Sequence, residues 1–168
     1  MLTRTTRHLL LARAAVVVVG VCCLALATGS GARAAAPSQF RFTSTDSFTD
    51  TTSCSFPIET NLTTTHVGRV YFDNAGNYLG LSDHADTIGT DTANGITLPE
   101  FDHTVDMFDS SNADMEVGTP IHILGVSGGL VIRDAGLLFF NPDGSIGYMH
   151  GQHPYLVGDT ASLCAAFS

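Results

Sequence analysis

The sequence predicts an all-β protein: a small antiparallel β-barrel, closed or partly open, with a β-sandwich as the alternative, after an N-terminal signal helix. From Phe40 onward, short runs of β-branched and aromatic residues are interrupted by Gly, Asn or Asp about every 8–12 residues. These runs amount to about eight to ten short strands, a number typical of small barrels and sandwiches. A pair of similar hairpin segments, described below, supports the same class.

The N-terminus has the three parts of a secretory signal. Residues 1–13 are basic and contain no acid, residues 14–27 are apolar, and Ala32-Arg33-Ala34 has the small-x-small form of a cleavage site. We therefore expect residues 1–34 to be a signal peptide and the protein to be secreted by a bacterium. A permanent span needs about 20 apolar residues, so we expect no integral membrane anchor after cleavage.

The charge balance restricts the partners. The chain has 168 residues with 7 basic and 16 acidic side chains, a formal net charge of −9. Four Arg fall in the signal, so the other 134 residues carry three Arg, no Lys and all 16 acids, which gives −13. Nucleic acid needs clustered Lys or Arg and is excluded as a partner. The length suits one domain over residues 40–168, preceded by a flexible N-terminus at 35–39.

Two cysteines remain after the signal, Cys54 near the new N-terminus and Cys164 near the end. An even count in an oxidising compartment predicts a disulfide between them. The bond would tie the two ends of the domain together.

The first half of the domain reads as strands in sequence order. Phe40, Phe42 and Phe48 mark a first strand region. Residues 54–58 open a second region, where Pro57 is confined to an edge or a bulge. Residues 60–65 are rich in Thr, which suits a half-exposed strand.

Two segments, 68–78 and 136–146, align without gaps. Each has Gly, an apolar strand ending in Phe, then Asp or Asn followed three residues later by Gly, and a second strand. This spacing fits a type I turn that closes with a left-handed Gly, so both segments predict β-hairpins.

Between the hairpins, residues 101–107 alternate, with Phe101, His103 and Met107 on one face and acids on the other. Helical spacing is also present, but the context favours a strand whose apolar face is buried. Residues 121–124, 130–132 and 137–140 then give three strands that are apolar on both faces. With Phe139, Phe140 and Tyr148, they are the expected lining of an apolar pocket inside the barrel.

Metal ligands are sparse. His150 and His153 form a close pair in a loop, and two imidazoles make at best a weak site. Six acids lie between Glu100 and Glu116, and Asp102, Asp106 and Asp109 among them are the candidates for a calcium site of an extracellular module. We favour a solvated acidic edge that keeps the protein soluble. No metal or other cofactor is expected.

Residues 125–129, Gly-Val-Ser-Gly-Gly, resemble the nucleophile motif of chymotrypsin-like secreted proteases, with His66 and Asp102 in the matching chain order. Val126 replaces the Asp of that motif, and the domain is too short for the two barrels of the family. We interpret the segment as a glycine-rich hairpin turn. His103 and His122 are the remaining candidates for acid–base chemistry, as buried histidines close to carboxylates.

The domain as a whole resembles the small exported β-proteins of unknown function common in actinobacteria. The likeness rests on the Ala/Arg-rich signal, Cys54-Ser-Phe-Pro57, Arg133-Asp-Ala-Gly136 and the Cys164 end. It implies a fold class and no catalytic residue.

We therefore expect a non-catalytic binding or structural module whose partner is a small apolar ligand, another protein or a second copy in a homo-oligomer. Two alternatives stay open. One is a small barrel-type enzyme, an isomerase or hydrolase, that uses a buried His with carboxylates. The other is a calcium-dependent adhesion module.

Overall fold

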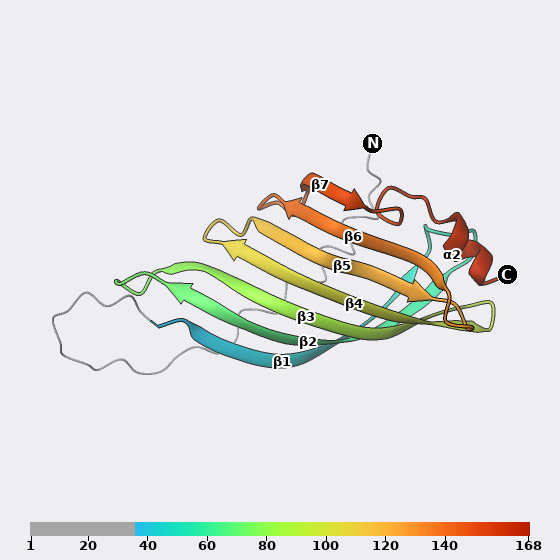
Figure 1. Ribbon diagram of the computed structural model, residues 1–168, viewed down its shortest axis with the longest axis horizontal. Helices are drawn as coiled ribbons and strands as arrows, with labels where there is room; N and C mark the ends of the chain where they lie inside the picture. Colours follow the sequence, from blue (N-terminus) through green and yellow to red (C-terminus); the bar gives the residue numbers. More distant parts are fainter. Residues whose placement is uncertain (1–35) are drawn as a thin grey trace.

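The computed structural model describes residues 36–168, and the expected signal peptide at residues 1–34 lies outside the described residues. The described chain forms seven strands and one short helix (Figure 1). They are β1 (Ser38–Asp50), β2 (Ile58–Phe72), β3 (Tyr78–Ala93), β4 (Ile96–Asp109), β5 (Asp114–Leu124), β6 (Leu130–Phe140), β7 (Ile146–Gln152) and α2 (Ala161–Ala166).

All seven strands belong to one antiparallel sheet in the order of the chain, β1 to β7. The expected all-β class is confirmed, and the sheet is not closed, because β1 and β7 are its two edges. β1 begins at Ser38, which pairs with Val70, so residues 38 and 39 belong to the sheet.

The strands are fewer and longer than expected, seven strands of 7 to 16 residues. The predicted strands at 130–132 and 137–140 are one strand, β6, which runs through Gly136. Residues 60–65 and the first half of the 68–78 hairpin are likewise one strand, β2, which begins only at Ile58. A glycine can stand inside a strand, where it marks a bulge or a bend, as well as at its end, and this ambiguity produced the shorter predicted strands.

Both predicted hairpins are confirmed. In the turn between β2 and β3, Asp73 N–H donates to Asn77 O (2.9 Å) and Gly76 N–H donates to Asp73 O (3.0 Å), with Gly76 at φ 86°. The turn between β6 and β7 repeats this pattern from Asn141 to Ser145, with Gly144 at φ 77°.

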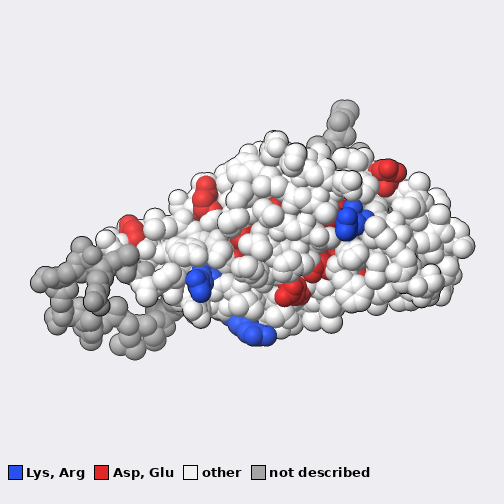
Figure 2. Space-filling view, in the orientation of Figure 1, with Lys and Arg blue, Asp and Glu red and all other residues white. Residues whose placement is uncertain are grey.

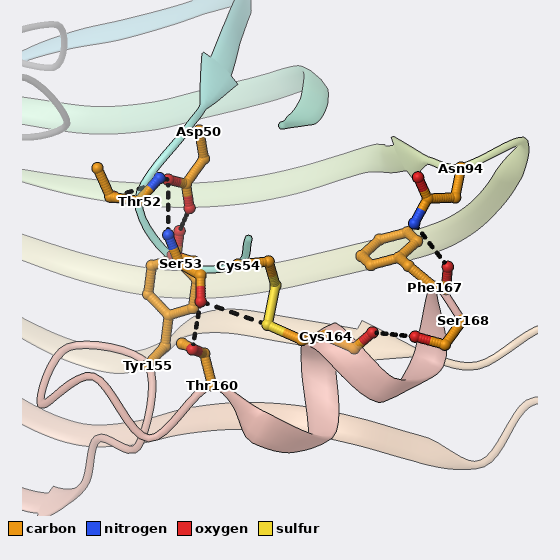
Figure 3. Close-up of a disulfide and its surroundings, with 10 residues drawn as sticks. All are labelled: Asp50, Thr52, Ser53, Cys54, Asn94, Tyr155, Thr160, Cys164, Phe167 and Ser168. Carbon is orange, nitrogen blue, oxygen red and sulfur yellow. Dashed lines mark hydrogen bonds between the residues drawn. A yellow bond between two sulfur atoms is a disulfide. The ribbon is translucent and has the colours of Figure 1, made fainter. Parts of the chain in front are cut away.

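The disulfide between Cys54 and Cys164 is confirmed, with a Cα–Cα distance of 5.6 Å (Figure 3). It joins the β1–β2 connection to α2, and both lie at the same end of the molecule in Figure 1. Thr160, just before the helix, donates a hydrogen bond from Oγ1 to Ser53 O (2.7 Å). Two segments that are 110 residues apart in the sequence are therefore fixed side by side.

The apolar core lies at this end of the sheet. Leu163 of α2 and Phe167 just after it are fully buried against Leu98 of β4. The other members of the core come from four strands: Ile58, Ala93, Ile123 and Ile132. A six-residue helix is too short to be stable alone, so burial of these two side chains and the disulfide hold it in place.

The sheet has an inner face, formed by the buried alternate residues of each strand, and an outer face. In β4 the inner face carries Glu100, Asp102 and Thr104, all buried, and the outer face carries Phe101 (46% exposed) and Met107 (38%). The alternation of residues 101–107 was therefore predicted correctly, but the wrong face was expected to be buried. In the space-filling view, charged side chains are scattered over a surface made mostly of uncharged residues (Figure 2).

Buried acids are the unusual feature of this fold. Seven of the 16 acidic side chains are buried: Asp50, Asp83, Asp91, Glu100, Asp102, Glu116 and Asp134. The three Arg of the described residues, at 41, 69 and 133, are all exposed. The acids at 100–116 are thus not the solvated edge that we expected, because three of the six are buried.

Candidate functional site: an acid-lined cavity

A cavity of about 280 Å³ lies on the inner face, next to the apolar core. Apolar side chains form much of its wall, among them Phe48, Leu62, Ile123, Leu138 and Phe140. Four acidic residues from four strands also line it: Asp50, Asp91, Glu100 and Glu116. Among the described residues, no Arg or His belongs to the lining.

Asp50, the last residue of β1, is held in the ionised form. Burial works against its charge, but hydrogen bonds from Ser53, Thr52 and Tyr155 outweigh burial and keep the pKa of Asp50 below its usual value. The donors are the amides of Thr52 (2.8 Å) and Ser53 (3.1 Å), the Thr52 hydroxyl (2.8 Å) and the Tyr155 hydroxyl (2.8 Å). Figure 3 shows Asp50 and Thr52 above the disulfide and Tyr155 to its left. Asp50 is therefore a fixed negative charge in the cavity wall.

Asp91 of β3 behaves in the opposite way. Burial raises its pKa, and the hydrogen bonds with Thr60 and Glu100, which lower it, do not fully compensate. Thr60 Oγ1 donates to Asp91 Oδ1 at 2.5 Å. A hydrogen bond between the carboxyl groups of Asp91 and Glu100 requires one of them to hold a proton. Asp91 is therefore harder to ionise than Asp50, although both line the cavity.

Tyr155 links this wall to the C-terminal segment. Its hydroxyl donates to Asp50 Oδ2, and its backbone N–H donates to Asp134 Oδ1 (2.9 Å). Burial, together with the nearby carboxylates, raises the pKa of Tyr155 far above its usual value, so the hydroxyl stays a hydrogen-bond donor at every physiological pH.

The three residues expected to line an apolar pocket are divided between the two faces. Phe140 is buried and lines the cavity. Phe139, its neighbour in β6, is only half-buried, points to the other face and pairs with Tyr148, which is 56% exposed. The cavity wall is also much more acidic than the apolar pocket that the sequence led us to expect.

The histidines expected to be buried are not part of this cavity. The side chain of His103 is 61% exposed on the outer face, where Nδ1 lies 2.6 Å from Asp86 Oδ1. His122 is half-buried in β5, and its backbone N–H donates to Asp102 Oδ1 (2.9 Å). Both histidines lie outside the cavity because the face of the sheet that we expected to be buried is the outer face.

The weak metal candidates do not come together. His150 is exposed, whereas His153 is buried with Nε2 3.3 Å from His150 O. Asp109 caps the turn after β4, where the Ser111 hydroxyl, the Ser111 amide and the Ala113 amide hold its pKa below its usual value. Asp102 and Asp106 lie on the inner face of β4. Within residues 36–168, no group of three or more His, Cys, Asp or Glu is placed to hold a metal ion.

The residues of the cavity were mostly missed in the sequence. Asp50 and Asp91 stand in Thr-rich contexts typical of exposed strands, and neither belongs to a motif. A signal was present in the alternation itself, since Thr87, Gly89, Asp91 and Ala93 share one face of β3 with Leu81 and Ala85. That pattern shows which residues share a face, but not that the face is buried.

The fold and the site define a class: an all-β domain with an open seven-stranded antiparallel sheet, a disulfide-anchored C-terminal helix and an interior cavity walled by apolar and acidic side chains. No protein family, no curated protein and no solved structure matches the chain. In the part of the chain that the structure describes, no helix has the length and apolar character needed to cross a membrane.

Proposed function

We propose that the protein binds a small amphiphilic cation, an apolar body carrying a protonated amine, in the acid-lined cavity. The observation that carries the proposal is the composition of the wall: four acidic residues among apolar side chains, with no Arg or His in the lining among the described residues. Burying a carboxylate is costly, and a cationic ligand next to the acids of this wall would offset part of that cost.

The size and position of the cavity support the same ligand class. A volume of about 280 Å³ is near the lower end for small-molecule sites, so the ligand has roughly ten heavy atoms or fewer. In this proposal the curved sheet acts as a partly open barrel, with the C-terminal segment covering the end next to the disulfide. The predicted signal peptide and the disulfide support binding outside the cell.

Asp50 and Asp91 have different roles in this proposal. Asp50 supplies a permanent negative charge, because its four donors keep it ionised. Burial raises the pKa of Asp91, and a bound ammonium group next to it would favour its ionised form. The affinity for the cation is therefore expected to rise as the pH rises through the raised pKa of Asp91.

A matched pair of ligands tests the proposal. Benzylamine and benzyl alcohol have nearly the same shape and differ in charge, so thermal melting with each isolates the effect of the ammonium group. We expect benzylamine to raise the melting temperature in a dose-dependent manner and benzyl alcohol to have little effect. Equal effects of the two ligands, or no effect of either, would rule out a cation site.

Variants locate the binding. We expect Asp50→Asn to weaken benzylamine binding at least about tenfold, because the fixed charge is lost. The control is Asp46→Asn, which removes one exposed acid from the same strand outside the cavity lining and should leave the affinity unchanged. A similar loss in both variants would point to a non-specific effect of net charge.

A further inference from the structure

Three polar side chains on β1, β2 and β3 form a second site. Ser44 Oγ lies 3.1 Å from His66 Nε2, and His66 Nδ1 lies 2.6 Å from Asp83 Oδ2. With the Nδ1 proton directed at the carboxylate, Nε2 is the ring nitrogen that accepts from the Ser44 hydroxyl. A hydroxyl, an imidazole and a carboxylate linked in this order are the arrangement that activates a serine nucleophile.

The sheet register brings the three residues together on the inner face. Ser44 pairs with Thr64, and His66, two residues further along β2, pairs with Ala85 of β3. Asp83 is two residues from Ala85, so it lies diagonally across from His66. The three residues are far apart in the sequence but adjacent across the paired strands. Their spacing in the sequence therefore did not reveal them.

Aromatic packing fixes the imidazole. The ring of Phe42 stacks on His66 with centroids 4.4 Å apart and planes 16° apart. Phe40 lies beside Phe42, over Gly68, where a Cβ atom would come within 2.3 Å of the Phe40 ring. The ring of His66 is thus held by a stack on one face and by hydrogen bonds at both nitrogens, so its orientation does not depend on a flexible loop.

The site is partly accessible and separate from the cavity. The side chains of His66 and Asp83 are 19% and 13% exposed, and Ser44 is half-buried. None of the three lines the acid-lined cavity. The protease-like reading of His66 with Asp102 and Ser127 does not apply, because His66 is hydrogen-bonded to Ser44 and Asp83 and Ser127 is exposed in the turn after β5.

We propose that Ser44 is a nucleophile that cleaves carboxylic esters with an apolar group, with His66 as general base and acid and Asp83 as a positioning residue. Ser44 Oγ forms a bond to the ester carbonyl carbon while its proton moves to His66 Nε2. The carbon–oxygen bond to the alcohol then breaks, and the alcohol leaves with that proton. Water, deprotonated by His66, attacks the acyl group, and its proton returns to Ser44 as the acid is released.

A neighbouring hydroxyl completes the site. Thr64 is the cross-strand partner of Ser44, and its Oγ1 lies 2.8 Å from Thr87 Oγ1. When Thr87 donates in that hydrogen bond, the Thr64 hydroxyl proton is available for the negative oxygen that develops during attack. The ring of Phe42, two residues from Ser44 on the same face of β1 and stacked on His66, provides an apolar surface for the acyl or alcohol group of the ester.

The first test uses a fluorophosphonate probe, which bonds to activated serines, and p-nitrophenyl butyrate as the ester. We expect covalent labelling at Ser44, located by peptide mass spectrometry, and measurable ester turnover. Ser44→Ala should abolish both. The matched control is Ser47→Ala, on the same strand but exposed and hydrogen-bonded to Asn61, which should retain both. Absence of labelling in the native protein, labelling elsewhere, or turnover that survives Ser44→Ala would overturn the proposal.

The second test separates catalysis from folding. Asp83→Asn should lower the maximal turnover rate at least about 100-fold with little change in KM. It should also remove the far-downfield proton resonance expected from the short hydrogen bond between His66 Nδ1 and Asp83, while near-ultraviolet circular dichroism stays native. A native-like Asp83→Asn variant with undiminished turnover would show that the pair is only structural and would overturn the proposed mechanism.

Discussion

At the scale of single residues, Asp91 is expected to weaken the fold when it is ionised. Burial raises the pKa of Asp91 above the usual value of 3.8. The contribution of Asp91 to the stability of the fold is therefore highest at low pH, where Asp91 is neutral, and it falls as the pH rises through the raised pKa and the carboxyl ionises. Asp91→Asn keeps the acceptor for Thr60 and carries no charge. We expect the variant to gain about 1 kcal/mol at pH 7 and nothing at pH 3.5, measured by urea unfolding at both values. An equal gain at the two pH values would contradict this account.

Asp134 is a residue of the opposite kind, since it stabilises the chain around it. It is fully buried, and its carboxyl oxygens accept from the amides of Tyr155 (2.9 Å) and Leu156 (3.2 Å). Asp134→Ala leaves two backbone donors without acceptors, and we expect a loss of about 3 kcal/mol in unfolding free energy. Asp134→Asn keeps one carbonyl acceptor and should cost less in the same urea titration. Equal losses in the two variants would show that packing, and not hydrogen bonding, makes Asp134 important.

The buried acids also mark the limit of sequence-based prediction at this scale. The alternation in β4 correctly separates Phe101 and Met107 from Asp102 and Asp106. A period of two shows which residues share a face, but burial depends on which face curves around the interior. That curvature is a property of the whole sheet, so the cavity acids could not be recognised from β4 alone.

At the scale of elements, the turns were the most predictable part of the fold. The hairpins at Asp73–Asn77 and Asn141–Ser145 follow from local chemistry, because a left-handed Gly stands where the backbone needs it. A third turn of the same kind, Asp109–Ala113, was missed because Asn112 takes the left-handed position at φ 64° in place of Gly. Asn adopts that conformation more readily than most residues, so the turn is chemically equivalent.

Some glycines inside strands are positions where a substitution by a larger residue should destabilise the sheet. Gly136 in β6 has φ 146°, and a Cβ atom there would lie 2.1 Å from His150 O of the neighbouring strand. Gly136→Ala should therefore destabilise the protein by about 3 kcal/mol, because the clash is with backbone and the conformation is strained. Gly129→Ala is the control, since nothing lies within 4 Å of its Cβ position and it should be nearly neutral. Thermal unfolding of both compares them, and a neutral Gly136→Ala would mean that the sheet relaxes there.

At the scale of the whole molecule, the sequence predicted the class and the covalent link but not the architecture. The all-β class follows from composition and turn residues, which determine local structure. The disulfide follows from the even number of cysteines in a protein that is expected to be exported to an oxidising compartment. The open edges, the division into two faces and the acid-lined cavity depend on how seven long strands curve together. No local pattern encodes that curvature, so the cavity and the Ser44–His66–Asp83 arrangement emerged only from the register of the sheet.

The disulfide is expected to be the largest single stabilising link in the molecule. It closes a loop of 110 residues, which in the chain-entropy model stabilises the fold by about 4–5 kcal/mol. It also holds α2 on the core, where Leu163 and Phe167 are almost fully buried. We expect the double variant Cys54→Ser/Cys164→Ser to lose a comparable free energy of unfolding and to expose α2 to limited proteolysis before the sheet.

Further measurements test whether the disulfide is present and what it contributes. The intact mass of the native protein should rise by two protons on reduction, and native protein treated with a thiol reagent should show no free cysteine. Cleavage of the variant at α2 should also abolish the benzylamine effect, because Tyr155 and Leu163 of the C-terminal segment line the cavity. A variant that unfolds with the free energy of the native protein would show that core packing alone fixes the helix, and that closure of the chain contributes nothing.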